Sequence, residues 1–308
     1  MVQKDCLNKK AIIICGPTAS GKTALAVECA KLLDSEVISA DSLYVYKHLN
    51  IGTAKPTIEE TCGVLHHMID VVEPTQDFSV SDYKTMAEPI LNDLFSRKKV
   101  PIICGGTGFY INSLLYDLSY GLSSANLEAR DKYIKLAEEY GKEYVYSILK
   151  QVDPESAEKL HYNDVKRVIR ALEIFESGIK KSDILDEKVE KFDYKAYCID
   201  FPRETLYERI NKRVDIMFES GLLDEVKSLI VQGITEENQC MQGIGYKEIF
   251  GYLNGNKTFE ETKELIKLNS RHYAKRQITF FKRLDGLNYL KPDDVKNLAR
   301  RIVEDYDR

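Results

Sequence analysis

The chain has 308 residues and a formal net charge of −5, and its 44% hydrophobic and 30% charged residues are ordinary for a soluble globular protein. No apolar run approaches the roughly 20 residues of a membrane span, and residues 1–10 lack the apolar stretch of a signal peptide, so we expect a cytoplasmic protein with no membrane partner. The seven cysteines are dispersed without Cys-x-x-Cys spacing, which argues against a disulfide framework and a zinc site. The acidic balance alone disfavours nucleic acid as a partner, although the distribution of charge matters more than its sum.

Strands and helices alternate over residues 1–116. The pattern predicts strands over residues 11–15, 36–40, 65–71 and 100–104, and helices over residues 22–33, 81–97 and 107–115. This alternation is typical of an α/β fold, a parallel sheet with helices on both faces. Ligands of such sheets lie at the carboxyl ends of the strands. The loops after Cys15, Ala40 and Cys104 are therefore the candidate binding sites.

From about residue 117 to residue 193 the strand signals disappear. Segments 126–140, 143–151, 154–160 and 164–177 have helical period and predict an inserted all-helical domain. Residues 194–201 predict a strand that rejoins the sheet, and the remainder is predicted to be mainly helical. We therefore divide the chain into a catalytic core, residues 1–116 and 194–308, and a helical insertion, residues 117–193.

The phosphate loop occupies residues 16–23, which read Gly16-Pro17-Thr18-Ala19-Ser20-Gly21-Lys22-Thr23 and fit the pattern Gly, four residues, Gly, Lys and Ser or Thr. A buried strand precedes this loop and a helix follows it, and this arrangement aims backbone N–H groups and a helix N-terminus at an anion. Lys22 supplies a positive charge, and the hydroxyl of Thr23 can hold Mg²⁺. The motif predicts a P-loop-like core that binds ATP, GTP or another carrier of a diphosphate.

Two further strand ends carry candidate chemistry. Asp41 directly follows the strand at 36–40, where a carboxylate can bind Mg²⁺, cap a helix or accept a proton from a substrate. The strand at 100–104 ends in Gly105-Gly106-Thr107, whereas a P-loop kinase or ATPase is expected to have an acidic residue there. The Thr107 hydroxyl and the exposed amides suit hydrogen bonding to a nucleophile or an anion. The alternative is that Thr107 only caps the next helix.

Residues 271–283 form a basic segment that has aromatic residues between its Lys and Arg side chains and contains no acid. One concentrated basic face can bind a phosphate backbone while acidic surfaces lie elsewhere. The segment therefore predicts an RNA contact in spite of the negative net charge. Lys166, Arg167 and Arg170 in the insertion predict a second basic patch, and Arg130 predicts a further contact.

Short motifs recur along the chain in a fixed order. After the phosphate loop come Ser39-Ala40-Asp41-Ser42, Ile51-Gly52-Thr53-Ala54-Lys55-Pro56, His66-His67-Met68-Ile69-Asp70, Gly105-Gly106-Thr107-Gly108, Asn163-Asp164-Val165-Lys166-Arg167, Gly243-Ile244-Gly245-Tyr246-Lys247 and Ala274-Lys275-Arg276-Gln277-Ile278-Thr279. In this order they resemble the tRNA dimethylallyltransferases, also called tRNA isopentenyltransferases. The resemblance covers nearly the whole chain.

The resemblance implies a reaction in which a dimethylallyl group moves from its diphosphate to the exocyclic N6 amine of the adenosine 3′ to the anticodon. The base must leave its stack to reach the site. The phosphate loop would hold dimethylallyl diphosphate, with Mg²⁺ as cofactor at Thr23. The implied catalytic residues are Asp41 as general base, Thr107 as the group that orients the amine, and Arg213 as the cation that stabilises the leaving diphosphate. Arg209 is a weaker candidate for that last role.

The resemblance further implies that the partner is the anticodon stem-loop of a tRNA, clasped between the core and the insertion, and that the protein acts as a monomer. The implied contacts come from the motifs after the phosphate loop and from the basic segment. They are Asp41, Ser42, Leu43, Tyr44, Thr107, Arg130, Asn163, Asp164, Val165, Lys166, Arg167, Gln242, Gly243, Ile244, Gly245, Tyr246, Lys247, Lys275, Arg276, Gln277, Thr279 and Lys282.

The chain departs from the family pattern directly after Asp41. Ser42-Leu43-Tyr44 stands where many members have Ser-Met-Gln, so Tyr44 replaces a glutamine that can read base edges. A tyrosine can stack on the base or hydrogen-bond to it instead. The chain lacks the C-terminal Cys/His finger of eukaryotic relatives, which favours a bacterial-type enzyme.

Three other functions stay open at this point. An adenylate isopentenyltransferase would use free AMP or ATP, but such a substrate needs neither the insertion nor the basic segment. A small-molecule P-loop kinase would need a metal-binding acid in place of Gly105-Gly106-Thr107. A non-catalytic RNA-binding module would leave the phosphate loop and Asp41 unexplained.

Overall fold

A computed structural model describes residues 9–117, 126–184 and 188–307 of the chain. The chain divides into two compact units: a core unit of Met1–Tyr116 with Glu190–Arg308, and a helical unit of Asp117–Val189. Within the described residues, no helix is both long and apolar enough to span a membrane. The described cysteines, Cys15, Cys29, Cys62, Cys104, Cys198 and Cys240, are all free.

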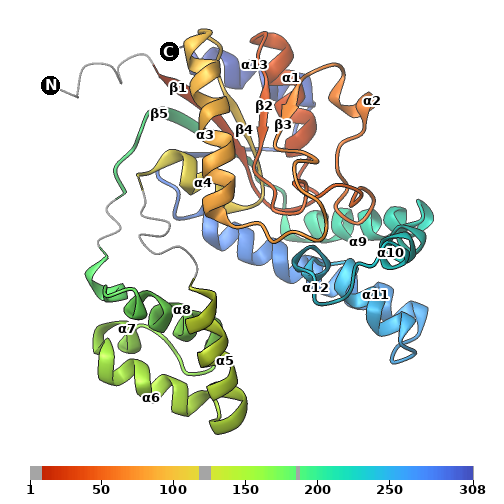
Figure 1. The fold of residues 1–308 in the computed structure, drawn as a ribbon. Helices are drawn as coiled ribbons and strands as arrows, with labels where there is room; N and C mark the ends of the chain where they lie inside the picture. Colours follow the sequence, from red (N-terminus) through yellow and green to blue (C-terminus); the bar gives the residue numbers. More distant parts are fainter. Residues whose placement is uncertain (1–8, 118–125, 185–187, 308) are drawn as a thin grey trace, which may run out of the picture. The chain divides into compact units, whose positions relative to one another are not determined.

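The core unit is built on a six-stranded, wholly parallel sheet with the strand order β3-β2-β4-β1-β5-β6 (Figure 1). The strands are β1 (Lys10–Cys15), β2 (Val37–Ser39), β3 (His66–His67), β4 (Ile102–Gly105), β5 (Asp193–Ile199) and β6 (Leu287–Leu290). Residues 11–15 of the central strand β1 are almost completely buried, because helices cover both faces of the sheet.

Two pairs of helices cover the sheet. On one face, α1 (Lys22–Leu32) and α13 (Val295–Tyr306) enclose a core that includes Ile12, Leu25 and Ile302. On the other face lie α3 (Val80–Ser96) and α4 (Gly108–Leu115), which are turned toward the viewer in Figure 1. There the rings of Tyr83 and Tyr110 stack with their centroids 4.0 Å apart.

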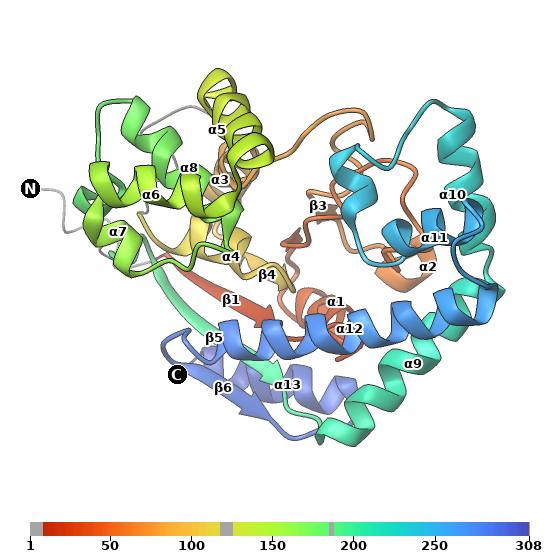
Figure 2. The same ribbon diagram turned by 90° about the horizontal axis from the view of Figure 1, so that it is seen from below.

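Helices from the C-terminal half lie at the carboxyl ends of the strands. They are α9 (Arg203–Glu219), α10 (Leu222–Val231), α11 (Tyr246–Leu253) and α12 (Phe259–Phe281). Figure 2 shows α12 running beside α9 and past the end of β1, and α9 and α12 are in contact. Loops of the core unit also contain two short helical turns, α2 (Ile58–Thr61) and η3 (Gln239–Gln242).

The helical unit contains α5 (Leu127–Tyr140), α6 (Lys142–Val152), α7 (Pro154–Glu158), α8 (Val165–Glu176) and the turn η2 (Lys181–Asp183). Its own core includes Val145, Leu149, Val168 and Leu172, all of which are almost completely buried. The predicted helices of this segment match the structure closely, because the longer ones, such as α8, have an apolar stripe at helical spacing. Parts of the predicted insertion, residues 118–125 and 185–187, lie outside the described residues.

Three sequence predictions need correction. The strand predicted over residues 65–71 is only His66–His67, because Met68 and Asp70 have φ angles of 62° and 56°, which a strand cannot contain. The edge strand β6 was not predicted, since only four residues form it. The helical unit ends at residue 189 and not at 193, because Lys191 N–H donates to the Leu115 carbonyl and thereby ties this segment to the core unit.

Candidate active site and nucleic-acid interface

The phosphate loop lies between β1 and α1, at the carboxyl end of the central strand. Gly16 and Gly21 have φ angles of 135° and 84°, which side chains disfavour, so the motif needs glycine at both positions. Gly16 also has no room for a side chain, because a Cβ there would lie 2.8 Å from Sγ of Cys198. The sequence of the loop therefore fixes a tight backbone curve that opens toward the N-terminus of α1.

Lys22 is enclosed at this point of the loop and bends back so that its Nζ donates to the carbonyl of Pro17 at 3.3 Å. Desolvation lowers the pKa of Lys22 below its ordinary value. The charge of Asp41 opposes this shift, whereas the charge of Arg213 adds to it. Two mutually repelling cations, Lys22 and Arg213, therefore face one place, which is the electrostatic arrangement expected of an anion site.

A cavity of about 590 Å³ opens beside the phosphate loop. Most of its charged groups are cationic, with one carboxylate among them. The charged and hydroxyl-bearing side chains that line it include Lys22, Thr23, Lys55, Glu60, Arg209, Lys212 and Arg213. This lining fits a ligand that carries several negative charges, such as a diphosphate.

Thr107 and Asp41 are brought together where β4 and β2 end side by side. The hydroxyl of Thr107 accepts a hydrogen bond from Ser42 N–H at 3.0 Å, and it makes no capping bond to its own helix α4. The alternative that Thr107 is a plain helix cap is therefore wrong. One oxygen of Asp41 accepts from Leu43 N–H at 3.0 Å. Gly105 permits this approach, because a Cβ there would lie 2.0 Å from the carbonyl oxygen of Ala40.

A second cavity, of about 410 Å³, has Asp41 in its wall and adjoins the first through shared residues. Lys22, Tyr44 and Arg213 line both cavities. The second cavity also has apolar walls, formed by Leu43, Met217, Ile244 and Ile266. The site thus joins an anion pocket to a chamber that offers both apolar surface and a carboxylate.

Tyr273 of α12 was not predicted as a site residue, yet it lines the second cavity. Its hydroxyl interacts with the side chains of Thr107 and Gln277, and burial raises the pKa of Tyr273 to about 12. No sequence signal distinguished Tyr273 from the other aromatic residues of the basic segment. The packing of α12 against the Thr107 turn is what brings Tyr273 to the site.

Arg213 reaches the site from α9 and is held by the loop at residues 50–55. Its Nη2 donates to the carbonyl of Thr53 at 2.9 Å, while its Nε is buried and has no hydrogen-bond partner among the residues that the structure describes. A buried donor without a partner fits a residue that awaits an anionic ligand. Arg209 has a different role, since its Nε donates to the carbonyl of Ala19 at 2.8 Å and supports the phosphate loop from outside.

Glu225 of α10 fixes the loop that holds Arg213. Its carboxylate accepts hydrogen bonds from the N–H groups of Asn50, Ile51 and Gly52 at 2.8, 2.7 and 3.0 Å, and from the hydroxyl of Tyr246 at 2.6 Å. Glu225 could not be predicted from the sequence, because a glutamate inside an amphipathic helix carries no signal that points to so distant a loop.

Tyr44, the residue that departs from the family pattern, belongs to the same network. Its hydroxyl donates to the carbonyl of Ala54 at 2.8 Å, and burial raises its pKa. The ring lines both cavities, so Tyr44 stays next to the ligand site although its hydroxyl is engaged by the loop.

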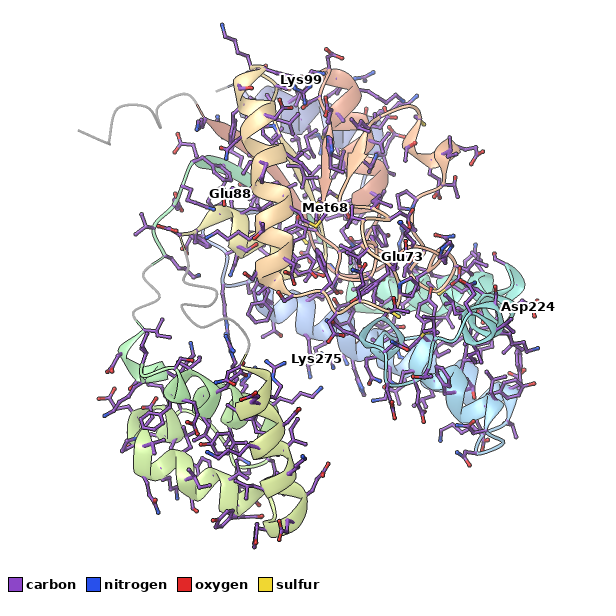
Figure 3. The ribbon with its side chains drawn as sticks, in the orientation of Figure 1. Met68, Glu73, Glu88, Lys99, Asp224 and Lys275 are labelled. Carbon is purple, nitrogen blue, oxygen red and sulfur yellow. The ribbon has the colours of Figure 1, made fainter. Side chains whose placement is uncertain are left out.

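The basic face of α12 consists of Lys275, Arg276 and Thr279, together with Lys282 directly after the helix, and all four are exposed. Lys275 projects away from the sheet (Figure 3), and the guanidinium of Arg276 lies 5.6 Å from the ring centroid of Tyr273. These four residues can be reached by a large ligand, as predicted for RNA contacts.

Two of the predicted RNA contacts are buried side chains that bond within the protein. Gln277 is only 5% exposed, and both ends of its amide are bonded inside the protein. Tyr246 is fully buried and donates to Glu225. By contrast, Lys247 of the same motif and Gln242 just before it are exposed, and Ile244 lines the second cavity. The motif at 243–247 therefore serves partly to build the core unit.

In the helical unit, Lys166 and Arg167 are exposed near the start of α8. Arg167 pairs with Asp164 at 3.2 Å, and Asn163 accepts a hydrogen bond from Lys142. Val165 packs at the edge of the unit's core. Arg130 binds the fully buried Glu173, its Nη2 lying 3.0 Å from Oε2, so at least part of its charge is used within the unit.

A metal ion at this site would depend on the ligand for most of its coordination. Within the described ranges, no group of three or more His, Cys, Asp or Glu residues is arranged to hold a metal. Thr23 lines the anion pocket at the N-terminus of α1 and offers one hydroxyl oxygen. This donor set fits Mg²⁺, which commonly takes one or two protein ligands together with substrate phosphates and water.

The chain matches the family model described as IPP transferase over residues 44–284, and the model described as Isopentenyl transferase over residues 9–73. The tRNA dimethylallyltransferase of Caldanaerobacter subterraneus subsp. tengcongensis is 46% identical over 297 residues, which cover 92% of each chain. That of Alkaliphilus oremlandii is 44% identical over 306 residues, which cover 97% of this chain and 98% of the relative.

Solved structures agree with these relatives. The full-length tRNA isopentenylpyrophosphate transferase from Bacillus halodurans has 38% sequence identity and a TM-score of 0.73, with 97% of both chains covered. A eukaryotic dimethylallyltransferase, described as acting on tRNA, has 30% identity and a TM-score of 0.82, with 96% of this chain and 78% of that chain covered. These identities are high enough for the likeness to extend beyond the fold.

Proposed function

Since the chain belongs to the IPP transferase family, whose members similar to it are tRNA dimethylallyltransferases, we propose that it transfers a dimethylallyl group from dimethylallyl diphosphate to the N6 amine of the adenosine 3′ to the anticodon of a tRNA. The observation that carries this proposal is the meeting of Asp41 and Thr107 beside an anion pocket that contains Lys22 and Arg213. A carboxylate next to a diphosphate site is what transfer to an amine requires.

Asp41 acts as the general base in this proposal. The N6 lone pair is delocalised into the purine ring, so the amine becomes a useful nucleophile only as its proton is removed. One oxygen of Asp41 is engaged by Leu43 N–H, and the other oxygen accepts the proton from N6. The new bond joins N6 to the first carbon of the dimethylallyl group, while the bond from that carbon to the diphosphate oxygen breaks.

Thr107 orients the amine. Its oxygen already accepts a hydrogen bond from Ser42 N–H, and its side chain also interacts with the Tyr273 hydroxyl, so in this proposal the Thr107 O–H turns from Tyr273 to the base when the substrate binds. The position of this donor restricts where N6 can lie.

The leaving diphosphate is stabilised by groups that already point at the anion pocket. Lys22, Arg213 and the N-terminus of α1 face the oxygen on which charge develops as the allylic C–O bond breaks. Mg²⁺ held by Thr23 would neutralise further charge on the diphosphate. The apolar walls of the adjoining cavity suit the hydrocarbon part of the substrate.

The exposed basic face of α12 is the proposed docking surface for the anticodon stem-loop within the core unit. Arg276 joins this face to the cavity that contains Asp41, because its side chain lines the cavity and is also exposed. A base that is taken out of its stack next to α12 could therefore enter the cavity. Lys166 and Arg167 supply a further basic patch in the helical unit.

The test is a transfer assay with radiolabelled dimethylallyl diphosphate, Mg²⁺ and one acceptor, either an anticodon stem-loop or free AMP. We expect label in the stem-loop and none in AMP. Label in AMP alone would move the function to an adenylate isopentenyltransferase. Label in neither acceptor, with ATP consumed in a parallel reaction, would favour a small-molecule kinase and overturn the roles given to Asp41 and Thr107.

A further inference from the structure

Gln277 connects two loops of the candidate active site through a single buried side chain. Its Oε1 accepts a hydrogen bond from Thr18 N–H in the phosphate loop at 2.9 Å. Its Nε2 donates to the carbonyl of Gly106, in the turn that precedes Thr107, at 3.0 Å. A buried amide is costly unless its polar groups are paired. These two hydrogen bonds therefore define the position of both loops relative to α12.

Both bonded groups lie beyond the ends of the sheet's hydrogen-bonded ladder. The register between β1 and β4 runs from Ile12 with Ile102 to Cys15 with Gly105. Thr18 and Gly106 follow the last pair, so the ladder no longer sets the distance between them. The amide of Gln277 spans this gap, and one side chain thereby continues the connection that the two strands make.

Close packing leaves little freedom around this connection. A Cβ added to Gly106 would lie 2.2 Å from Nε2 of Gln277, so glycine is required for the contact. One turn further along α12, the ring of Phe280 would lie 2.0 Å from a Cβ added to Gly108. The same ring lies with its centroid 5.2 Å from that of Phe109. α12 is therefore seated directly on the turn that carries Thr107.

We propose that Gln277 is a positioning residue that sets the spacing between the phosphate loop and the Thr107 turn. The inference rests on the proposed function, in which the first loop holds the leaving diphosphate and the second orients the amine. In-line transfer requires reacting atoms about 3–3.5 Å apart, and a displacement of about 1 Å can cost about 100-fold in rate. A link between these two loops therefore bears directly on catalysis.

Gln277 and the basic face lie on opposite sides of α12. Lys275 and Arg276, on the same turn of the helix, point outward from the basic face, while Gln277 points inward. A stem-loop that binds the basic face would therefore contact the same helix whose Gln277 side chain connects both loops. The basic segment thus has two functions, one on each side of the helix.

The experiment compares Gln277→Met, which keeps the length and volume but removes both hydrogen bonds, with Gln277→Glu, which keeps the acceptor for Thr18 N–H and places an oxygen against the Gly106 carbonyl. Gln232→Met is the matched control, because Gln232 is exposed at the end of α10. For each full-length variant we would measure kcat and KM for both substrates, the dissociation constant of the stem-loop, and the folded fraction by circular dichroism.

We expect both Gln277 variants to lose about 10- to 100-fold in kcat per folded molecule, with the dissociation constant of the stem-loop within about twofold of the wild-type value. A merely structural role would lower the folded fraction and leave kcat per folded molecule unchanged, which would overturn the inference. A weakened stem-loop affinity that accounts for the whole loss of activity would also overturn it, and would assign Gln277 to RNA contact. If the wild-type protein transferred no label at all, the proposed function would fail instead.

Discussion

The backbone N–H of Ser42 donates to the hydroxyl of Thr107 across a sequence separation of 65 residues, at 3.0 Å. This bond joins the loop after β2 to the turn after β4, and it places the carboxylate and the hydroxyl of the candidate site on adjoining segments. It also explains why a threonine at the start of α4 makes no capping bond.

Replacing Thr107 by valine should lower kcat by about 100-fold, because the isosteric side chain loses both the acceptor for Ser42 N–H and the donor for the substrate. Thr107→Ser keeps the hydroxyl and should retain activity within about tenfold of wild type. Single-turnover transfer to a stem-loop measures both variants. Equal rates for valine and serine would remove the hydroxyl from the mechanism.

Replacing Asp41 by alanine should slow transfer by about 10²–10⁴-fold, the range for removal of a general base. Binding of the stem-loop should stay largely intact, because Asp41 is one of many contacts. Rapid-quench transfer assays combined with filter binding separate the two quantities. Persistence of transfer near the normal rate would mean that another group accepts the proton.

As pH rises, the affinity for dimethylallyl diphosphate should begin to fall at a lower pH than it would if Lys22 had the pKa of an ordinary lysine. Enclosure lowers the pKa of Lys22 below 10.5 in the free protein. The anion binds the protonated form, so affinity is complete below the lowered pKa and declines as pH rises through it. Lys22→Arg keeps its charge over this range and should lose the decline. Calorimetric titrations from neutral to alkaline pH test this, and parallel curves for the two proteins would contradict it.

Replacing Lys275 and Arg276 together by alanine should weaken stem-loop binding and reduce the slope of log affinity against log salt by about 2. The matched control is Lys296→Ala with Arg300→Ala on α13, where the same charge is removed from exposed positions on the helix that covers the sheet. Fluorescence anisotropy at several salt concentrations gives the slopes. If both double variants behave alike, only net charge matters and α12 has no specific role.

Glu225→Gln should destabilise the fold by about 1.5–3 kcal/mol, since a charged acceptor of three N–H groups and one hydroxyl becomes neutral and partly a donor. Because the loop at 50–55 holds Arg213, kcat should fall as well. Glu219→Gln, at the exposed end of α9, is the control. Urea unfolding and transfer assays should show both effects for Glu225 and neither for Glu219.

Much of the architecture could be predicted because its signals are local. The phosphate loop is fixed by residues that are adjacent in sequence, and the helices of the helical unit have apolar stripes that are legible in short windows. The grouping of the loops after Cys15, Ala40 and Cys104 followed from the rule that parallel strands bring their carboxyl ends to one edge of the sheet. These rules were sufficient to place Asp41, Thr107 and Lys22 in one region.

The supporting residues could not be predicted, since their partners are far away in sequence. Glu225 binds a loop more than 170 residues earlier, and Gln277 bonds to Thr18 and Gly106 across 259 and 171 positions. Gln277 also lies in a segment whose composition favours a solvent-facing role. Composition describes a helix as a whole, whereas burial separates its two sides, and only the packed structure shows which side faces inward.

The pairing of the two ends of the core unit has a consequence for biosynthesis. The Nζ of Lys10, at the start of β1, donates to the carbonyl of Tyr306 in α13 at 2.6 Å. The hydroxyl of Tyr306 in turn donates to the carbonyl of Lys10 at 3.1 Å. β1 lies beside β5, and α13 closes the apolar core over α1. During translation the central strand β1 is therefore made early, but its neighbours β5 and α13 are complete only when residues near 306 have been made. The helical unit, whose contacts are local, can fold on the ribosome well before that.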